Sequence, residues 1–144
     1  MANCTIRTAS SKDAAAIAEL CRESLGYACT EERVAVRLSQ CDSARERIFV
    51  ACQDGTVVGF IHAQIYQTLY FDALVNILGL AVFAEARRQG VGTALLRETE
   101  SWAAEVGAVG IRLNSGSTRT DAHGFYRHAG FSEEKAQIRF LKRL

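Results

Sequence analysis

The chain has 144 residues, of which 49% are hydrophobic and 23% charged, and its formal net charge is +1. This is ordinary globular usage, and the length is enough for one domain with its own core. A charge so near zero gives no overall field toward nucleic acid or an anionic membrane, and no apolar run is long enough to span a bilayer. We therefore expect a single domain, residues 1–144, with neither nucleic acid nor a membrane as a partner.

The five cysteines are odd in number and show no Cys-x-x-Cys pairing. Reduced thiols in a cytoplasmic protein are the expected state, and the N-terminal residues have no basic segment followed by an apolar core. No cysteine or histidine pair has the spacing of zinc ligands, so no metal is expected.

The first half of the chain predicts a strand, two helices and a β-hairpin. Polar and apolar residues alternate in the predicted strands, whereas Ile17, Leu20 and Cys21 form one stripe of the first helix. Asp-Gly is a strong signal for the hairpin turn. The segments are a strand at Cys4–Thr8, a helix at Ala14–Leu25 that Gly26 ends, a helix that opens at Thr30, and two strands joined by Asp54-Gly55, of which the second runs from Val57 to Tyr66.

The second half predicts a strand–helix–strand unit followed by a short helix and a last strand. Ala73–Val82 is apolar almost throughout, which is typical of a central strand. A helix from about Gly90 to Val106 and a strand at Val109–Asn114 then imply a parallel crossover. A helix at Asp121–Ala129 and a strand at Gln137–Leu141 complete the chain. We expect an α/β domain with a mixed central sheet of about six to seven strands and about four helices.

The turn between the apolar strand and its helix has the features of a diphosphate site. Gly90 and Gly92 lie in the first helical turn, where backbone N–H groups have no partner within the helix and no side chain hinders an anion. Arg87 and Arg88 add positive charge. The stretch lacks the Lys-Ser/Thr pair of a Walker loop and the third glycine of a dinucleotide fold.

Two motifs together carry a family resemblance. Arg87-x-x-Gly90-x-Gly92 after a strand resembles the pyrophosphate-binding motif of the GNAT superfamily of acyl-CoA-dependent N-acetyltransferases. Downstream, at the expected interval, a short helix presents Phe125-Tyr126 and ends in Gly130-Phe131, which is similar to a second signature of that superfamily. The chain is identified as a member over nearly its whole length.

The resemblance implies acetyl-CoA as co-substrate and transfer of its acetyl group to a primary amine of a small molecule by direct attack on the thioester. A phenol with a pKa near ~10 suits protonation of the departing thiolate, and Tyr126 matches the tyrosine that acts as general acid in similar enzymes. The backbone of the last strand residues would pair with the pantetheine arm like an added strand. The implied acetyl-CoA contacts are Leu80, Ala81, Val82, Arg87, Arg88, Gln89, Gly90, Val91, Gly92, Thr93, Asn114, Arg119 and Tyr126.

The general base does not follow from the resemblance. Many relatives place an acid on the strand before the pantetheine-pairing residues, where this chain has Asn76, Leu78 and Gly79, and others place a glutamate where it has Asn114. The remaining candidates are Asp72, His123 and Asp121, acting directly or through water. His123 has a competing interpretation as a residue that bonds a backbone carbonyl, and His62 is interpreted as a surface or core residue.

The acceptor pocket is expected between the first two helices and the hairpin strands, where Tyr27, Glu31 and Tyr66 are candidate substrate-binding residues. The second motif and the C-terminal residues are similar to small-molecule acetyltransferases, including aminoalkylphosphonate N-acetyltransferases. A protein lysine or N-terminal acetyltransferase and a non-catalytic acyl-CoA-binding module are the alternatives. A homodimer is also expected, because Ile138, Phe140 and Leu141 lie in a predicted edge strand.

Overall fold

The structure is a computed structural model that describes residues 3–144. The chain divides into two compact units, unit 1 up to Leu113 and unit 2, Asn114–Leu144. Unit 1 contains, in chain order, β1 (Thr5–Thr8), the short 3-10 helix η1 (Ser11–Asp13), α1 (Ala14–Glu23), α2 (Glu31–Ser39), β2 (Glu46–Gln53), β3 (Thr56–Tyr66), β4 (Leu74–Val82), the 3-10 helix η2 (Ala84–Ala86), α3 (Val91–Glu105) and β5 (Ile111–Leu113).

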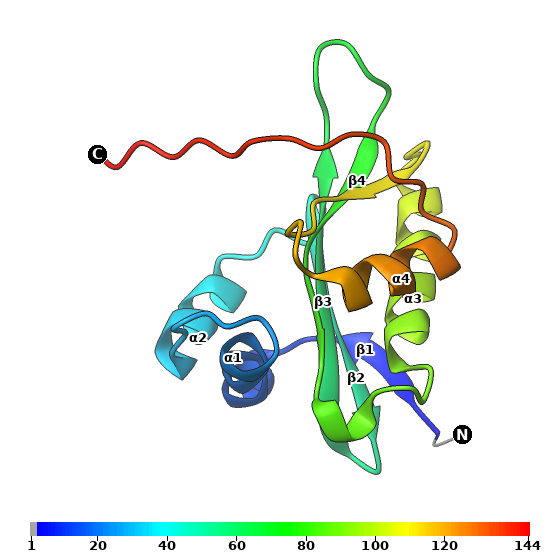
Figure 1. The fold of residues 1–144 in the computed structure, drawn as a ribbon. Helices are drawn as coiled ribbons and strands as arrows, with labels where there is room; N and C mark the ends of the chain where they lie inside the picture. Colours follow the sequence, from blue (N-terminus) through cyan, green and yellow to red (C-terminus); the bar gives the residue numbers. More distant parts are fainter. Residues whose placement is uncertain (1–2) are drawn as a thin grey trace. The chain divides into compact units, whose positions relative to one another are not determined.

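The strands form one sheet in the order β1-β2-β3-β4-β5. Neighbours are antiparallel from β1 to β4, whereas β5 is parallel to β4 because α3 carries the chain back along the sheet. Figure 1 shows α1 and α2 on one side of this sheet and α3 on the other. The predicted α/β class, the mixed sheet and the parallel crossover are confirmed.

Side-chain hydrogen bonds fix the starts of η1 and α2. Asp13 accepts a hydrogen bond from the backbone N–H of Ser10 at 2.8 Å. Its carboxylate also accepts hydrogen bonds from Nη1 and Nη2 of Arg7, which tie β1 to the residue directly before α1. Thr30 accepts from the backbone N–H of Arg33 at 3.1 Å and so begins α2. These bonds hold the starts of η1, which lies directly before α1, and of α2.

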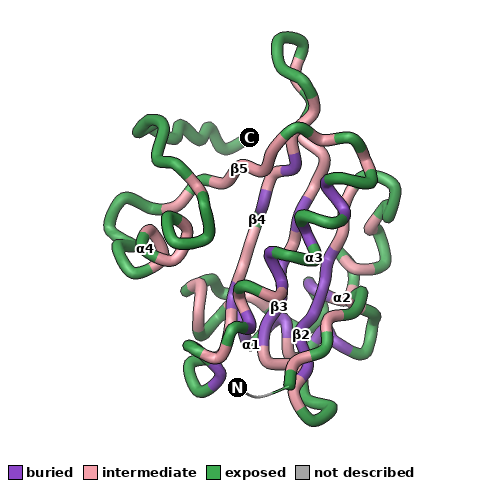
Figure 2. The backbone as a smooth tube through the Cα atoms, turned by 90° about the vertical axis from the view of Figure 1, so that its right-hand side faces the viewer, coloured by how far each residue is buried: buried purple, intermediate pink, exposed green. Residues whose placement is uncertain are grey.

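The core has two layers because strand residues alternate between the faces of the sheet. One layer joins α1 and α2 to the sheet, and its buried apolar residues include Ile17, Leu20, Val34, Ile48, Val50, Phe60 and Ala81. The other layer joins α3 to the opposite face of the sheet. It contains the buried α3 residues Val91, Leu95 and Trp102 and the strand residues that alternate with those of the first layer, such as Ile61. Figure 2 shows these buried segments in β2, β3, β4 and α3.

The hairpin between β2 and β3 turns at Asp54 and Gly55, whose φ angles of 51° and 78° match a type I′ turn. Further along, the pairing of β3 with β4 shifts by one residue: His62 lies opposite Gly79 and Ala63 opposite Ile77. Leu78 therefore has no partner in β3 and forms a β-bulge. A bulge bends its strand and increases the local twist.

The sheet has five strands rather than the predicted six to seven. β5 spans only Ile111–Leu113, shorter than the predicted Val109–Asn114, although Val109 N–H still bonds the Ala73 carbonyl at 2.9 Å. The predicted strand at Gln137–Leu141 is wrong, since no ladder bonds join these residues to any strand within residues 3–144. Alternating polarity identifies an extended segment, whereas a strand also needs a partner for its backbone groups.

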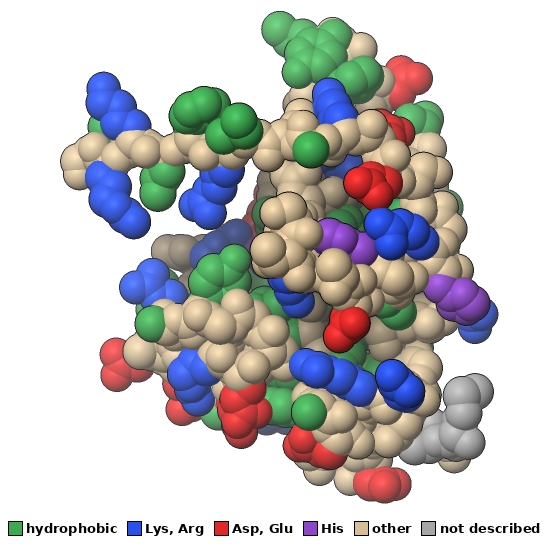
Figure 3. All heavy atoms as spheres, in the orientation of Figure 1, with side chains coloured by type: hydrophobic (Ala, Val, Ile, Leu, Met, Phe, Trp, Pro, Cys, Tyr) green, Lys and Arg blue, Asp and Glu red, His purple; other side chains and the backbone are tan. Residues whose placement is uncertain are grey.

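Unit 2 contains one helix, α4 (Thr120–His128). Gly130 follows it at a φ of 99°, the left-handed conformation that commonly ends a helix and favours glycine. Residues 132–144 are exposed and outside any regular element. Figure 3 shows both apolar and cationic side chains along this segment.

Candidate active site

The site begins where β4 and β5 separate. The parallel pairing covers only Val75–Ile77 of β4, and beyond Ile77 no strand within the described residues pairs with that edge. The bulge at Leu78 lies at the point of separation. The backbone that follows, through Leu80 and Ala81 to Val82, is therefore available to an extended ligand that adds as a strand.

Two side chains close the end of this free edge. Ser24, directly after α1, donates its hydroxyl to the Val82 carbonyl at 3.2 Å, and the Arg87 Nε donates to the same oxygen at 3.2 Å. Val82 pairs with Gly59 of β3 on one edge, and its carbonyl is satisfied by these two side chains although β5 does not reach it on the other edge. The free edge extends from the bulge to this point, where the chain enters η2 and the glycine turn.

The glycine turn supplies an anion site at the start of α3. Gly90 is the N-cap residue with a φ of 82°, and it offers no side chain to the first helical turn. The N–H groups of Val91, Gly92 and Thr93 thus have no partner within the helix, since the intrahelical bonding begins with Ala94 N–H to the Gly90 carbonyl at 3.0 Å. A phosphate fits this arrangement of outward donors and helix dipole.

The backbone of the turn is held in an uncommon conformation. Arg88 has a φ of 62°, which costs free energy for a residue with a side chain. Gln89 fixes the turn from inside, because it donates to the Glu85 carbonyl at 3.2 Å and accepts from Gln53 at 3.0 Å. Such turns direct successive N–H groups toward one point, which suits a diphosphate.

Unit 2 carries the predicted acid. The Tyr126 ring packs edge-on against Phe125 and Phe131, with ring centroids 5.4 and 5.7 Å away. Burial raises the pKa of the Tyr126 phenol, and the nearby charge of Arg119 opposes that shift only in part. The phenol is therefore protonated throughout the neutral range and can donate a proton.

The candidate bases have different surroundings. His123 Nε2 lies 2.8 Å from the Gly116 carbonyl, as its alternative interpretation expects, so this nitrogen carries a proton. Asp121 is exposed in the first turn of α4, and Asp72 is exposed in the segment between β3 and β4. Asp72 precedes the bulge by six residues, a separation of roughly 20 Å along a strand.

Polar side chains on β3, β4 and β5 form a second group that the sequence analysis did not assemble. Arg112 donates to the Asn76 side-chain oxygen at 2.7 Å, and its guanidinium carbon lies 4.4 Å from the centroid of the Tyr66 ring. His62 Nε2 lies 2.8 Å from Glu46 Oε1. His62, Gln64 and Tyr66 alternate along β3 and so share one face, a period that could have been seen in the sequence.

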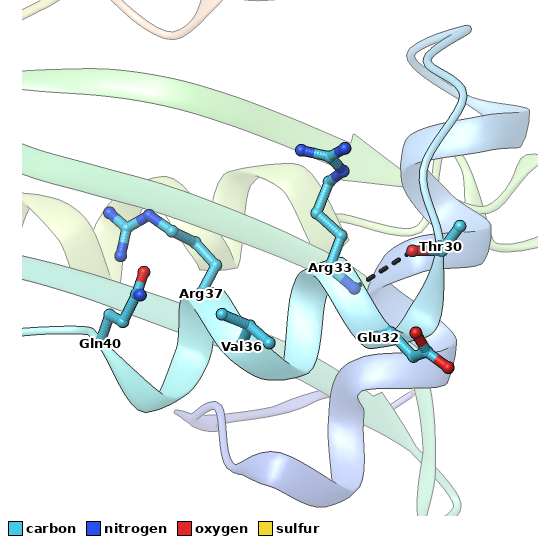
Figure 4. A pocket seen from close by; sticks show the side chains of 6 residues that line it. All are labelled: Thr30, Glu32, Arg33, Val36, Arg37 and Gln40. Atoms are coloured by element: carbon cyan, nitrogen blue, oxygen red, sulfur yellow. Dashed lines mark hydrogen bonds between the residues drawn. The ribbon is translucent and has the colours of Figure 1, made fainter.

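A shallow hollow lies along α2. It is lined by Thr30, Glu32, Arg33, Val36, Arg37 and Gln40, and in Figure 4 the guanidinium groups of Arg33 and Arg37 extend from the same side of the helix. Of the predicted substrate residues, Glu31 lies in the first turn of α2 and Tyr27 is exposed in the link before it. The α1–α2 side of unit 1 thus presents cationic, acidic and aromatic groups.

Comparisons with known proteins show the family of the chain. A sequence profile described as the Acetyltransferase (GNAT) family matches residues 14–131. The aminoalkylphosphonate N-acetyltransferase of Salmonella typhimurium is 31% identical, covering 98% of this chain and 92% of that protein. An aminoglycoside N(6')-acetyltransferase type 1 of Stenotrophomonas maltophilia is also 31% identical, covering 94% and 91%. The solved structure of aminoglycoside N-acetyltransferase AAC(6')-Iy with CoA has a TM-score of 0.85 at 20% identity, covering 100% and 97%.

The chain belongs to the acetyltransferase (GNAT) family. It is an acetyl-CoA-dependent N-acetyltransferase, and the predicted transfer of an acetyl group from acetyl-CoA to the amine of a small molecule is confirmed. Within residues 3–144, none of the helices has the length and apolar character that crossing a membrane requires.

Proposed function

We propose that this enzyme acetylates a small primary amine that also carries an anionic group, of the aminoalkylphosphonate kind. The observation that carries this proposal is the Arg112 guanidinium on β5, oriented by Asn76 and by the face of the Tyr66 ring. A guanidinium presents its N–H donors in a planar fork, whose geometry matches the oxygens of a phosphonate or carboxylate. The Salmonella relative acts, by its name, on an aminoalkylphosphonate.

The charges on this side of unit 1 also favour an anionic acceptor over a polycation. Arg33 and Arg37 line the hollow together with one acid, Glu32, and Glu46 on β2 is already bonded to Arg37 at 2.8 Å. An aminoglycoside carries several ammonium groups and would need several free carboxylates. These surroundings support an acceptor with one amine and one acid group.

Acetyl-CoA binding is proposed along the free edge of β4 and the glycine turn. The pantetheine arm would pair with Leu80, Ala81 and Val82, and the pyrophosphate would accept N–H groups from Gly90 to Thr93, with Arg87 and Arg88 supplying charge. Asn114, Arg119 and Tyr126 would complete the contacts. The unpaired edge and the uncapped helix start, which follow one another in unit 1, support this assignment.

Tyr126 is the proposed general acid, which protonates the departing thiolate. Its raised pKa supports the role, because a neutral phenol is required. The candidate bases from the sequence, Asp72, His123 and Asp121, remain open, although the bond of His123 to Gly116 supports a structural role for that histidine. We further propose that residues 1–144 act as one N-acetyltransferase domain, which the family match across both units supports.

A homodimer in the cytoplasm is proposed as the working form. Ile138, Phe140 and Leu141 are exposed large apolar side chains in the C-terminal segment, and apolar residues that remain exposed often bind a second chain. All five cysteines are free thiols, which supports a reducing compartment.

The test is thiol release from acetyl-CoA with a panel of amines: aminomethylphosphonate, an alkylamine of equal length without an acidic group, a lysine peptide and an aminoglycoside. We expect the phosphonate to give the highest kcat/KM. Arg112→Gln should raise KM for the phosphonate by roughly 10- to 100-fold, the value of a hydrogen bond to a charged group, and leave the KM for the alkylamine unchanged. Arg139→Gln, in the exposed C-terminal segment, is the matched control. Preference for the aminoglycoside or the peptide would contradict the acceptor class.

A further inference from the structure

Three polar side chains from three elements of unit 1 form a hydrogen-bonded chain that has no role so far. Arg37 on α2 and His62 on β3 both contact the same oxygen of Glu46 on β2, with Arg37 Nη2 and His62 Nε2 each 2.8 Å from Glu46 Oε1. The Glu46 and His62 side chains are only 15% and 20% exposed. Burying a carboxylate and an imidazole is unfavourable unless they form hydrogen bonds, so the hydrogen bonds among Arg37, Glu46 and His62 hold the Glu46 and His62 side chains in place.

The strand register places His62 beside the active site. His62 lies opposite Ile48 on β2 and opposite Gly79 on β4. Ile48 belongs to the core between the sheet and α1 and α2, and directly opposite residues share a face, so the imidazole lies on the α1–α2 face. Gly79 follows the bulge at Leu78 and lies on the free edge of β4.

Gly79 leaves the space beside His62 open. A Cβ at this position would meet the ring of Phe60 at 3.7 Å and the Leu25 Cδ1 at 3.9 Å, which are ordinary contacts on the α1–α2 face. Gly79 is not among the glycines with positive φ, so its backbone does not require glycine. Glycine inside a strand often marks a place where a ligand approaches closely. Here no side chain of residue 79 stands between His62 and the free edge of β4.

The protonation of the pair leaves one imidazole nitrogen as an acceptor. Burial raises the pKa of Glu46, but the hydrogen bond from His62 and the charge of Arg37 together lower it below its ordinary value, so Glu46 is ionised. Burial lowers the pKa of His62 more than Glu46 raises it, so the imidazole is neutral at pH 7. Nε2 then donates its proton to the carboxylate, and Nδ1 keeps its lone pair.

We propose that His62 is the general base of acetyl transfer, acting directly or through one water, and that Glu46 and Arg37 are positioning residues. The inference rests on the proposed function. Nδ1 takes a proton from the amine nitrogen as its bond to the acetyl carbon forms and the bond from that carbon to sulfur breaks. Tyr126 supplies a proton to the leaving sulfur and regains one as the imidazolium releases its own to solvent. The products are the acetylated amine and the CoA thiol, so atoms and charge balance.

The geometry suits this role. Neighbouring strands are about 4.8 Å apart, so an arm added to β4 would lie roughly 10 Å from the His62 backbone. The imidazole and the acceptor amine, or one water, span that distance. The charged groups that act on the imidazole are Glu46 and Arg37. Cys41, whose thiol lies 3.9 Å from the Glu46 carbonyl, is neutral because burial raises its pKa. The β4 residue opposite His62 is Gly79, which has no side chain and so adds no charge.

The first test is His62→Gln in the full chain. The Gln side-chain amide can still donate to Glu46, so the fold is retained, but it cannot accept a proton. We expect kcat to fall by ~100-fold or more with the KM for acetyl-CoA unchanged. His128→Ala, an exposed histidine at the end of α4, should keep full activity. A normal melting temperature and unchanged CoA binding verify that each variant is folded.

The second test is the pH profile of kcat at saturating acceptor, where ionisation of the free amine affects KM instead. We expect a rising limb below pH 6.5, which moves to lower pH in Glu46→Gln because the carboxylate raises the His62 pKa, and which is absent in His62→Gln. A merely structural pair would not move this limb. Imidazole NMR titration of the same variants should give the same shift without turnover.

The two proposals fail separately. If the wild-type enzyme acetylates a different amine from the anionic ones, the acceptor class is wrong, and the His62 comparison is made on that amine. If His62→Gln keeps kcat within twofold on the amine that the wild type uses, or if the limb stays in place in Glu46→Gln, His62 is not the base.

Discussion

Arg87 Nε donates to the Val82 carbonyl at 3.2 Å, so the first residue of the glycine turn holds the last residue of β4. This bond spans η2 and joins the two parts of unit 1 at which acetyl-CoA is proposed to bind, the free strand edge and the helix start. Arg87 thus has a structural bond as well as a charge near the proposed pyrophosphate.

Gly92→Glu tests the anion site. A glutamate in the first turn of α3 favours the helix dipole, so the fold should not weaken, but its charge and bulk oppose a diphosphate. We expect CoA affinity, measured by calorimetry, to fall at least ~10-fold, about 1.4 kcal/mol. Ala104→Glu, exposed in the last turn of the same helix, adds the same charge and should bind CoA normally. Unchanged affinity in Gly92→Glu would remove the pyrophosphate from this turn.

Tyr126→Phe tests the acid. The ring contacts with Phe125 and Phe131 need no hydroxyl, so the fold should be retained. We expect kcat to fall by ~100-fold, near the lower end for general acid catalysis because water substitutes in part, with little change in KM. The wild-type kcat should fall only above about pH 10, since the neutral phenol is lost there and burial raises its pKa further. Tyr70→Phe, exposed before β4, is the control; a full kcat in Tyr126→Phe would make the tyrosine a packing residue.

The Arg7–Asp13 pair predicts loss of stability in acid. The bonds from Arg7 lower the pKa of Asp13, more than burial raises it, and Ser10 adds to the effect. Because the folded pKa lies below the unfolded one, the contribution is complete above about pH 4 and is lost as the pH falls through the folded pKa. Asp13→Asn should cost about 1–3 kcal/mol at pH 7 in urea unfolding, and its stability should fall less than that of the wild type below pH 4. Parallel acid profiles for the two proteins would refute this.

The C-terminal segment tests the homodimer. Phe140 is 89% exposed, and its replacement by aspartate would place a charge in any apolar interface. Light scattering at micromolar concentration should give a dimer for the full chain and a monomer for Phe140→Asp. Lys142→Glu changes the charge of the same segment without removing an apolar group and should remain a dimer. A monomeric wild type at that concentration counts against the assembly.

Local patterns predicted most of unit 1. The helix expected from about Gly90 to Val106 is observed at Val91–Glu105, and the Asp54-Gly55 turn lies where the alternation of the strands placed it. These features depend on neighbours in the chain: periodicity, a glycine at positive φ, a capping side chain. The predicted last strand failed because alternation cannot supply a partner strand.

The features that were missed depend on contacts between distant residues. Glu46 and His62 are sixteen residues apart and meet only through the pairing of β2 with β3, and Arg37 reaches them from α2. Nothing local marks Leu78 as a bulge either, because a bulge is a property of two strands and their register. His62 therefore read as a surface or core residue until the register was known.

The division of unit 1 by its sheet has a consequence for divergence within the family. The helix that begins at the proposed pyrophosphate site packs on one face, and the helices α1 and α2 beside the proposed acceptor site lie on the other (Figure 1). Substitutions in α1, α2 and the outward positions of β3 can therefore accumulate during evolution without disturbing the packing of α3. An ancestral enzyme of this architecture could acquire a new amine substrate gradually, through changes on a single face, while its use of acetyl-CoA stayed constant.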